Sequence, residues 1–135
     1  MTFFLDIQPT QVPFDLGVDD QGYACVVFNL YVLREPSAQF IEELVKVLED
    51  ADVGTFGKNI FASSLIAHPT GDGPFLTLVE TGGAGGIRTQ NSAAPSGERA
   101  TASVTTRAKT YKVARSMARA AYDAFSVVRN QTVTP

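Results

Sequence analysis

Residues 99–128, RATASVTTRAKTYKVARSMARAAYDAFSVV, contain the two clearest structural patterns of the chain. In the first ten residues small apolar side chains alternate with hydroxyl side chains, the period of a half-buried strand. In the next twenty, alanine is frequent and apolar residues recur every three or four positions, as in an amphipathic helix. The pattern predicts a helix packed on a sheet. Its apolar seam consists of Ala114, Met117, Ala121, Ala124, Phe125 and Val128.

Segments rich in Val, Ile, Leu, Phe and Tyr predict four more strands upstream of this unit. Between the first two, residues 10–22 are rich in Pro, Gly and Asp, which predicts a turn segment. After the last helix, the tail RNQTVTP is polar and predicted to be extended at its end. The four strands are expected at residues 3–8, 23–33, 59–67 and 74–81.

A second helix is predicted over residues 38–51, with Ser37 as its N-cap. Its apolar residues make one stripe, and its charged residues lie on the other side. Together these elements predict an α+β fold: a mainly antiparallel sheet of about five strands with two helices packed on it, in a single domain over residues 1–135. The stripe is Phe40, Ile41, Leu44, Val47, Leu48 and Ala51, and the charged side is Glu42, Glu43, Lys46, Glu49 and Asp50.

Composition excludes several classes of protein. The chain has 135 residues, of which 44% are hydrophobic and 19% charged, typical of a globular domain. Cys25 is the only cysteine and His68 the only histidine, which excludes an internal disulfide, a cysteine-rich zinc site and a two-histidine relay. No apolar run approaches the roughly 20 residues of a membrane span. We expect a soluble, unprocessed chain made in a reducing compartment.

Charge is divided unevenly along the chain. Residues 1–80 carry twelve acids and three bases, net −9, whereas residues 81–135 carry two acids and eight bases, net +6, which sum to the net charge of −3. This division predicts two faces of opposite sign, as in a subunit that packs head to tail against copies of itself. The alternative is that the charges simply lie on a solvated surface.

The glycine-rich stretch 82–97 is predicted to be an exposed loop or arm. Its start, Gly82-Gly83-Ala84-Gly85-Gly86, follows a strand as a phosphate-binding loop does. Such a loop also needs a Lys-Ser or Lys-Thr pair that enters a helix. Here Ile87-Arg88-Thr89 leads into more loop, which disfavours nucleotide binding.

The remaining reactive residues do not form a recognisable catalytic set. Asp15, Asp19 and Asp20 lack the pattern of a calcium loop and are interpreted as hairpin-turn residues. Cys25 lies in an apolar strand and is interpreted as a small buried side chain. His68 precedes Pro69 and has no catalytic companion. We therefore predict no catalytic, cofactor-binding or metal-binding residues, and a protein that is not an enzyme.

Basic residues are the candidate site for a subunit or other partner. Lys112, Arg115 and Arg119 are spaced so that they share one face of the last helix. Such a face could contact phosphate or an acidic partner, or it could be an ordinary solvated face. The absence of tryptophan argues against a surface that reads nucleic-acid bases. The full set is Arg88, Arg107, Lys109, Lys112, Arg115 and Arg119.

From Ser37 onward the chain resembles the tail terminators, also called tail completion or minor capsid proteins, of long-tailed bacteriophages. An opening helical segment, AQFIEELVKVLEDADVGTFGKNIFASS, is followed by PFLTLVETGG, which is similar to the family's VxETGG pattern. After the glycine-rich loop, ATASVTTRAKTY resembles the family's xxVxVRxxxY stretch and leads into the alanine-rich helix through Phe125. The resemblance covers about ninety residues, and its motifs are specific through their order and spacing.

The rest of the resemblance is in a different order. In the family, a segment similar to residues 3–32, FFLDIQPTQVPFDLGVDDQGYACVVFNLYV, follows the last helix. Here it precedes the first helix, so the chain resembles a circular permutation joined around Glu35–Ser37. Joining Pro135 to Met1 would restore the family's order. Permutation is tolerated when the two ends of a domain lie close together.

The resemblance implies a structural function. Tail terminators form a hexameric ring on the completed tail tube, stop its polymerisation, and offer a docking surface to the head–tail connector or stopper protein. DNA passes through the lumen without sequence-specific binding. The resemblance thus implies a virion protein of the tail or neck, assembled in the host cytoplasm, with no cofactor and no membrane contact. The alternatives are a head-completion or other neck protein, or an α+β domain that binds a small molecule or nucleotide.

Overall fold

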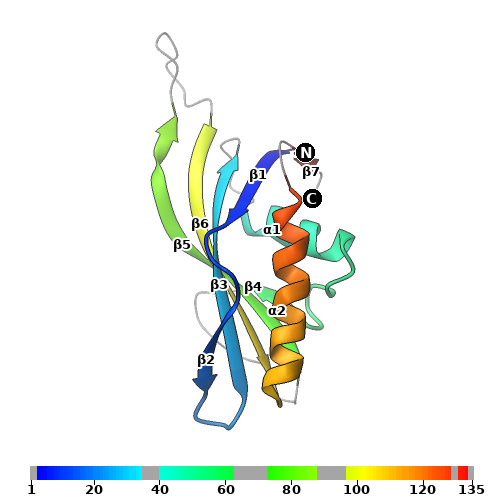
Figure 1. Ribbon diagram of the computed structural model, residues 1–135. Helices are drawn as coiled ribbons and strands as arrows, with labels where there is room; N and C mark the ends of the chain where they lie inside the picture. The colour runs from blue at the N-terminus through cyan, green and yellow to red at the C-terminus, as the bar shows by residue number, and fades with distance from the viewer. Residues whose placement is uncertain (1–2, 35–39, 63–72, 88–96, 129–130, 134–135) are drawn as a thin grey trace.

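The alternating segment at residues 99–108 forms a central strand of a seven-stranded sheet (Figure 1). The computed structural model describes residues 3–34, 40–62, 73–87, 97–128 and 131–133. The α+β class and the mainly antiparallel sheet are confirmed, and the described ranges contain seven strands where about five were expected. The elements are β1 (Phe3–Pro9), β2 (Phe14–Val18), β3 (Ala24–Arg34), α1 (Phe40–Asp50), β4 (Ile60–Ala62), β5 (Phe75–Ile87), β6 (Gly97–Ala108), α2 (Tyr111–Ser126) and β7 (Gln131–Val133).

Three long strands make the middle of the sheet, in the order β5-β6-β3. β3 and β6 pair antiparallel along their whole length, from Ala24↔Ala108 to Arg34↔Glu98. The other edge of β3 is shared by β1, which pairs with its last residues, and β2, which pairs with its first. β7 adds to β1, and the short β4 pairs parallel with β5 at the opposite end of the sheet.

Both helices lie on one face of the sheet (Figure 1). The inward residues Ala100, Ala102, Val104 and Thr106 of β6 are buried as their period predicts. The Thr106 hydroxyl donates a hydrogen bond of 2.8 Å to the carbonyl oxygen of Ala114, which satisfies a buried polar group and links β6 to α2. Within the described ranges no helix covers the opposite face of the sheet.

The seam predicted for the last helix is confirmed. α2 begins after Thr110, whose side chain accepts a hydrogen bond from the Val113 amide and caps the helix. Met117 and Ala121 are buried against the sheet, and Phe125 is fully buried. Ala118 joins the buried set as well, because α2 contacts β1, β3 and β6 together and buries a broad face.

The first helix buries more of its surface than one stripe. Leu44 and Leu48 are fully buried as predicted. The assignment of Glu43 to the solvated side is wrong, because its side chain is 0% exposed. α1 contacts α2, β5 and β7, so elements surround it on more than one side. Ala51, predicted to be buried, is exposed because it lies just past the end of the helix.

Several predicted loops contain strands. The turn-rich segment 10–22 includes β2, and the polar tail includes β7. The stretch 82–97 is not simply a loop, because Gly82, Gly83 and Ala84 pair with β6. Gly82 lies at a bulge with a φ of 123°, a backbone conformation that favours glycine. The strand predicted at 59–67 is seen as β4 only, and residues 63–67 lie outside the described ranges.

Candidate functional site

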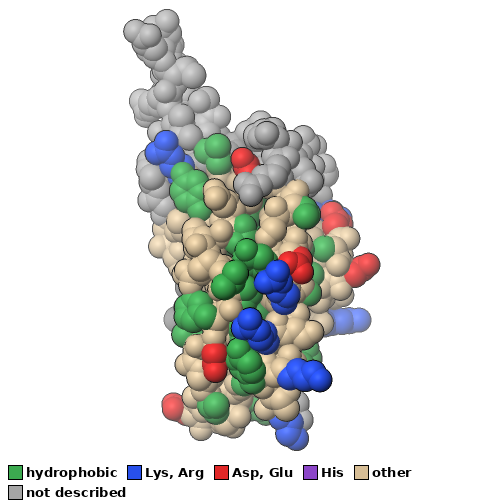
Figure 2. Space-filling model, viewed as in Figure 1, with side chains coloured by type: hydrophobic (Ala, Val, Ile, Leu, Met, Phe, Trp, Pro, Cys, Tyr) green, Lys and Arg blue, Asp and Glu red, His purple; other side chains and the backbone are tan. Residues whose placement is uncertain are grey.

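The outward face of α2 carries exposed basic side chains. Lys112, Arg115 and Arg119 are all exposed, and Figure 2 shows Lys and Arg side chains gathered over this helix. They line a shallow surface hollow, which has no enclosed volume to hold a buried ligand. Its lining residues are Tyr111, Lys112, Arg115, Ser116, Arg119, Ala120 and Asp123.

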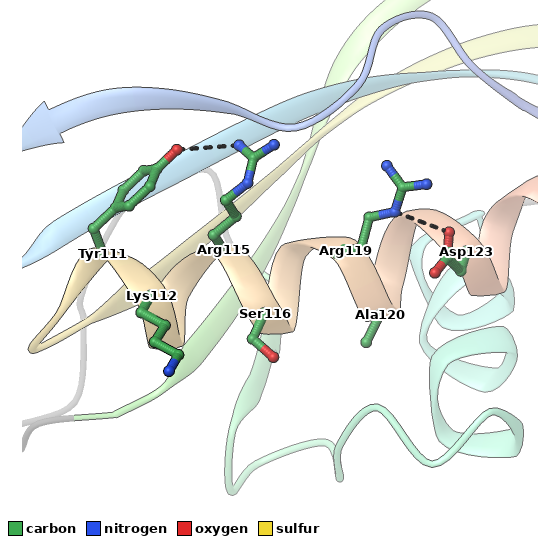
Figure 3. Close-up of a pocket in the computed structure, with 7 residues that line it drawn as sticks. All are labelled: Tyr111, Lys112, Arg115, Ser116, Arg119, Ala120 and Asp123. Carbon is green, nitrogen blue, oxygen red and sulfur yellow. Dashed lines mark hydrogen bonds and ion pairs between the residues drawn. The ribbon is translucent and has the colours of Figure 1, made fainter.

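Lys112, Arg115 and Arg119 do not form a single stripe on the helix. Figure 3 shows Arg115 and Arg119 pointing to the side of α2 that Tyr111 also takes, whereas Lys112 points to the other side. The Arg115 Nη1 atom donates to the Tyr111 hydroxyl at 3.1 Å and to the Pro13 carbonyl oxygen at 3.3 Å. Arg115 is therefore held beside the chain that enters β2.

The positive charge of Arg119 is partly neutralised by a carboxylate on the same helix. Its Nε atom lies 3.3 Å from a carboxylate oxygen of Asp123, one turn further along. Its guanidinium carbon lies 4.9 Å from the centroid of the Tyr122 ring. Both side chains of this ion pair are more than half exposed, so the pair adds little stability and leaves Arg119 accessible to a partner.

Arg107 does not belong to this surface. Its side chain is 4% exposed, with Nε 2.6 Å from the Asp19 carboxylate and Nη2 2.6 Å from the Gln21 amide oxygen. The guanidinium carbon lies 4.0 Å from the centroid of the Tyr23 ring. The expectation of a partner-facing Arg107 is wrong, because this charge ties β6 to the turn between β2 and β3.

Asp19 organises that turn, as its interpretation as a hairpin residue predicts. One of its carboxylate oxygens accepts hydrogen bonds from the amides of Gln21 and Tyr23, at 2.9 and 3.0 Å. The bond from the Tyr23 amide is the main reason that the pKa of Asp19 lies below its ordinary value, and the hydrogen bond from Arg107 lowers it further. The turn is therefore built around an ionised carboxylate.

The lowered pKa of Asp19 predicts an acid-dependent loss of stability. The folded protein favours the charged carboxylate, so its contribution is present above the ordinary pKa and is lost as the pH falls through the folded-state value. Asp19→Asn should be less stable than the wild type at neutral pH, and the gap should narrow toward about pH 3. Urea denaturation over a pH series measures this.

Asp20→Asn is the matched control for the pH series, because Asp20 is exposed in the same turn. Its free energy of unfolding should follow the wild type at every pH. A gap between Asp19→Asn and wild type that stays constant down to pH 3 would contradict the role given to the Asp19 charge.

The other predicted residues fall in different places. Lys109 is exposed just before the Thr110 cap, whereas Arg88 and His68 lie outside the described ranges. Cys25 is half-buried, not fully buried, because it lies on the face of β3 that the helices do not cover. Burial raises the pKa of its thiol.

Within the described residues, no group of three or more His, Cys, Asp or Glu side chains is placed to hold a metal ion. No helix in the described part of the chain is long and apolar enough to cross a membrane. No family model, curated protein or solved structure matches the chain.

The exposed apolar edge of β2 was not predicted from the sequence. Phe14, Leu16 and Val18 of β2 are 40%, 59% and 69% exposed, and Val12 just before them is 56% exposed. Their alternation with Asp15 and Gly17 is typical of a strand. The surrounding Pro, Gly and Asp residues favour turns, so the segment was predicted to be a turn.

A groove at the β4–β5 end of the sheet was also missed. It lies where β4, β5 and the start of α1 meet, and it combines apolar residues with two carboxylates. Its residues are separated widely in the sequence, so no local pattern indicates it. They are Ile41, Glu42, Phe56, Ala62, Leu78, Glu80 and Gly82.

Proposed function

We propose that this protein is a structural ring subunit of the tail-terminator type, which caps a tail tube and joins it to a head–tail connector or stopper protein. The observation that carries the proposal is that the segments of the resemblance pack as one unit. α1 contacts β5 and α2, β5 pairs with β6, and α2 packs on β6. The unit leaves the basic face of α2 exposed for a partner.

The pairing of the first and last strands is compatible with the permuted order that the resemblance implies. β1 and β7 pair antiparallel, with Phe3 opposite Val133 and Phe4 opposite Thr132. The first and last strands thus lie side by side (Figure 1). Chain ends held this close could be joined by a short connection without moving the core, which supports reading residues 3–32 as the family's last segment.

The alternatives fit the observations less well. A nucleotide-binding domain would place the glycine stretch before a helix N-terminus, whereas Gly82 and Gly83 lie in the β5–β6 ladder and β6 follows. A head-completion or other neck protein shares the structural class and differs in its position in the particle. The ring proposal is a non-enzymatic one, with DNA passing through the lumen.

Sedimentation of the purified protein over a range of concentrations tests the proposal. We expect association to a hexamer at high concentration, and negative-stain images should show closed rings with an open centre. A protein that stays monomeric at every concentration, both alone and when mixed with tail tubes, would contradict the ring function.

The basic face of α2 predicts a salt-dependent effect. The double substitution Arg115→Glu with Arg119→Glu should weaken assembly or attachment, because it reverses two exposed charges. Single exposed pairs contribute roughly 0–1 kcal/mol, so the ring should be weakened and not abolished. The difference in assembly between the double variant and the wild type should be smaller at 1 M than at 0.1 M salt, because the Debye length falls from about 10 Å to about 3 Å. Sedimentation and the yield of completed particles measure it.

The matched control is Lys46→Glu with Lys58→Glu, which makes the same change in net charge on α1 and the loop after it. Assembly of this control should stay near the wild type. If both double variants behave alike, the bases of α2 are an ordinary solvated face.

A further inference from the structure

We infer that copies of this chain join head to tail through two surfaces of the sheet, so that the β2 edge of one copy docks in the β4–β5 groove of the next. The inference rests on the proposed ring function and deepens it by naming the two surfaces. β2 pairs with the edge of β3 that faces away from β6, whereas β4 and β5 lie on the other side of β6. Contact between two different surfaces is heterologous, and it closes a ring when the rotation between copies allows.

The β2 edge has the properties of a strand that is completed by a partner. Within the described ranges β2 pairs with β3 alone, so its other edge is free. Leu16 and Val18 are among the most exposed large apolar residues, at 59% and 69%. A strand edge with exposed apolar side chains invites pairing with another chain unless something covers it.

The groove offers a complementary surface. β4 pairs with β5 only from Ile60↔Leu76 to Ala62↔Leu78. From Val79 onward, no strand among the residues described pairs with β5 on the edge where β4 pairs. Phe56 lines the groove and is 54% exposed. An incoming edge would therefore meet both free main-chain groups and an apolar side chain.

The charges around the β4–β5 groove favour a second copy of this chain as its occupant. Glu42 and Glu80 are both exposed and line the groove, and none of the described residues that line it is Lys or Arg. Beside the β2 edge, Arg115 is held by its hydrogen bond to the Pro13 carbonyl. The β2 edge also carries the exposed Asp15. The complementary charges are therefore Arg115 beside the apolar edge and the two acids Glu42 and Glu80 of the groove.

Leu16→Asp tests the edge. Because Leu16 is mostly exposed, the variant should keep the thermal transition of the wild type, and circular dichroism checks this. Loss of an apolar contact and the added charge near Glu80 should raise the dissociation constant for self-association roughly tenfold or more. Val127→Asp is the matched control, since Val127 is 68% exposed at the other end of α2. It should associate as the wild type does.

A charge swap tests the pairing of the two surfaces. Arg115→Glu and Glu80→Lys should each weaken self-association several-fold at low salt. The double variant Arg115→Glu/Glu80→Lys should recover it, and so should an equimolar mixture of the two single variants. Recovery requires that residue 115 of one copy faces residue 80 of another, which a merely structural role for either residue does not predict.

The outcomes separate this inference from the ring function. Hexamers that are insensitive to Leu16→Asp and to the charge swap would overturn the inference and leave the ring intact. Assembly that stops at a dimer would overturn head-to-tail joining in favour of β2 pairing with itself. A wild-type protein that never associates would overturn both.

Discussion

Replacing Phe28 with alanine is expected to lower the free energy of unfolding by about 3–5 kcal/mol. The Phe28 side chain on β3 is 0% exposed. Its ring makes edge-to-face contacts with Tyr122 and Phe125 of α2, with centroids 5.8 and 6.4 Å apart. The substitution leaves a cavity between the sheet and the longest helix, where neither layer can easily close over it.

Equilibrium denaturation at low protein concentration measures this loss without interference from self-association. Phe56→Ala is the control, because it removes the same side chain from a position that is 54% exposed. Its cost should stay below about 1 kcal/mol. Equal costs for the two variants would show that β3 does not pack on α2 through Phe28.

Leu44→Ala should lower the free energy of unfolding by about 2–5 kcal/mol. Leu44 is 0% exposed on α1, and α1 contacts α2 and β5. Lys46→Ala, two residues further along the helix, should cost less than about 1 kcal/mol, because it removes only an exposed ion pair with Asp50. A cost for Leu44→Ala below roughly 0.5 kcal/mol would place Leu44 on the surface and reverse the orientation assigned to α1.

The core of the fold could be predicted because it is encoded in local periodicity. The alternation over residues 100–106 and the three-to-four spacing from Ala114 to Phe125 depend only on neighbouring residues. The same holds for Leu44 and Leu48, which are buried as expected. A period of 2 or 3.6 fixes which side of an element faces the core, whatever the rest of the chain does.

The set of basic residues proposed to contact a partner could be predicted only in part. Arg115 and Arg119 are exposed on α2 because helical spacing places them opposite its buried seam. No such rule applies to Arg107, because its partner Asp19 is distant in the sequence and is brought to it by the register of β3 with β6. A charged residue in a strand can be paired or free, and its own neighbours in sequence do not decide which.

The sequence by itself determined the two helices, the central strands, the buried seam of α2, the burial of Leu44 and Leu48, and the exposure of Lys112, Arg115 and Arg119 on α2, since each follows from the period of one element. Only the tertiary structure decided that Glu43 is buried, that Arg107 is held by the β2–β3 turn, and that β2 and the β4–β5 groove lie on opposite sides of β6 in one sheet. Those features depend on strand order and on what packs around each element, and pairing between distant segments sets both.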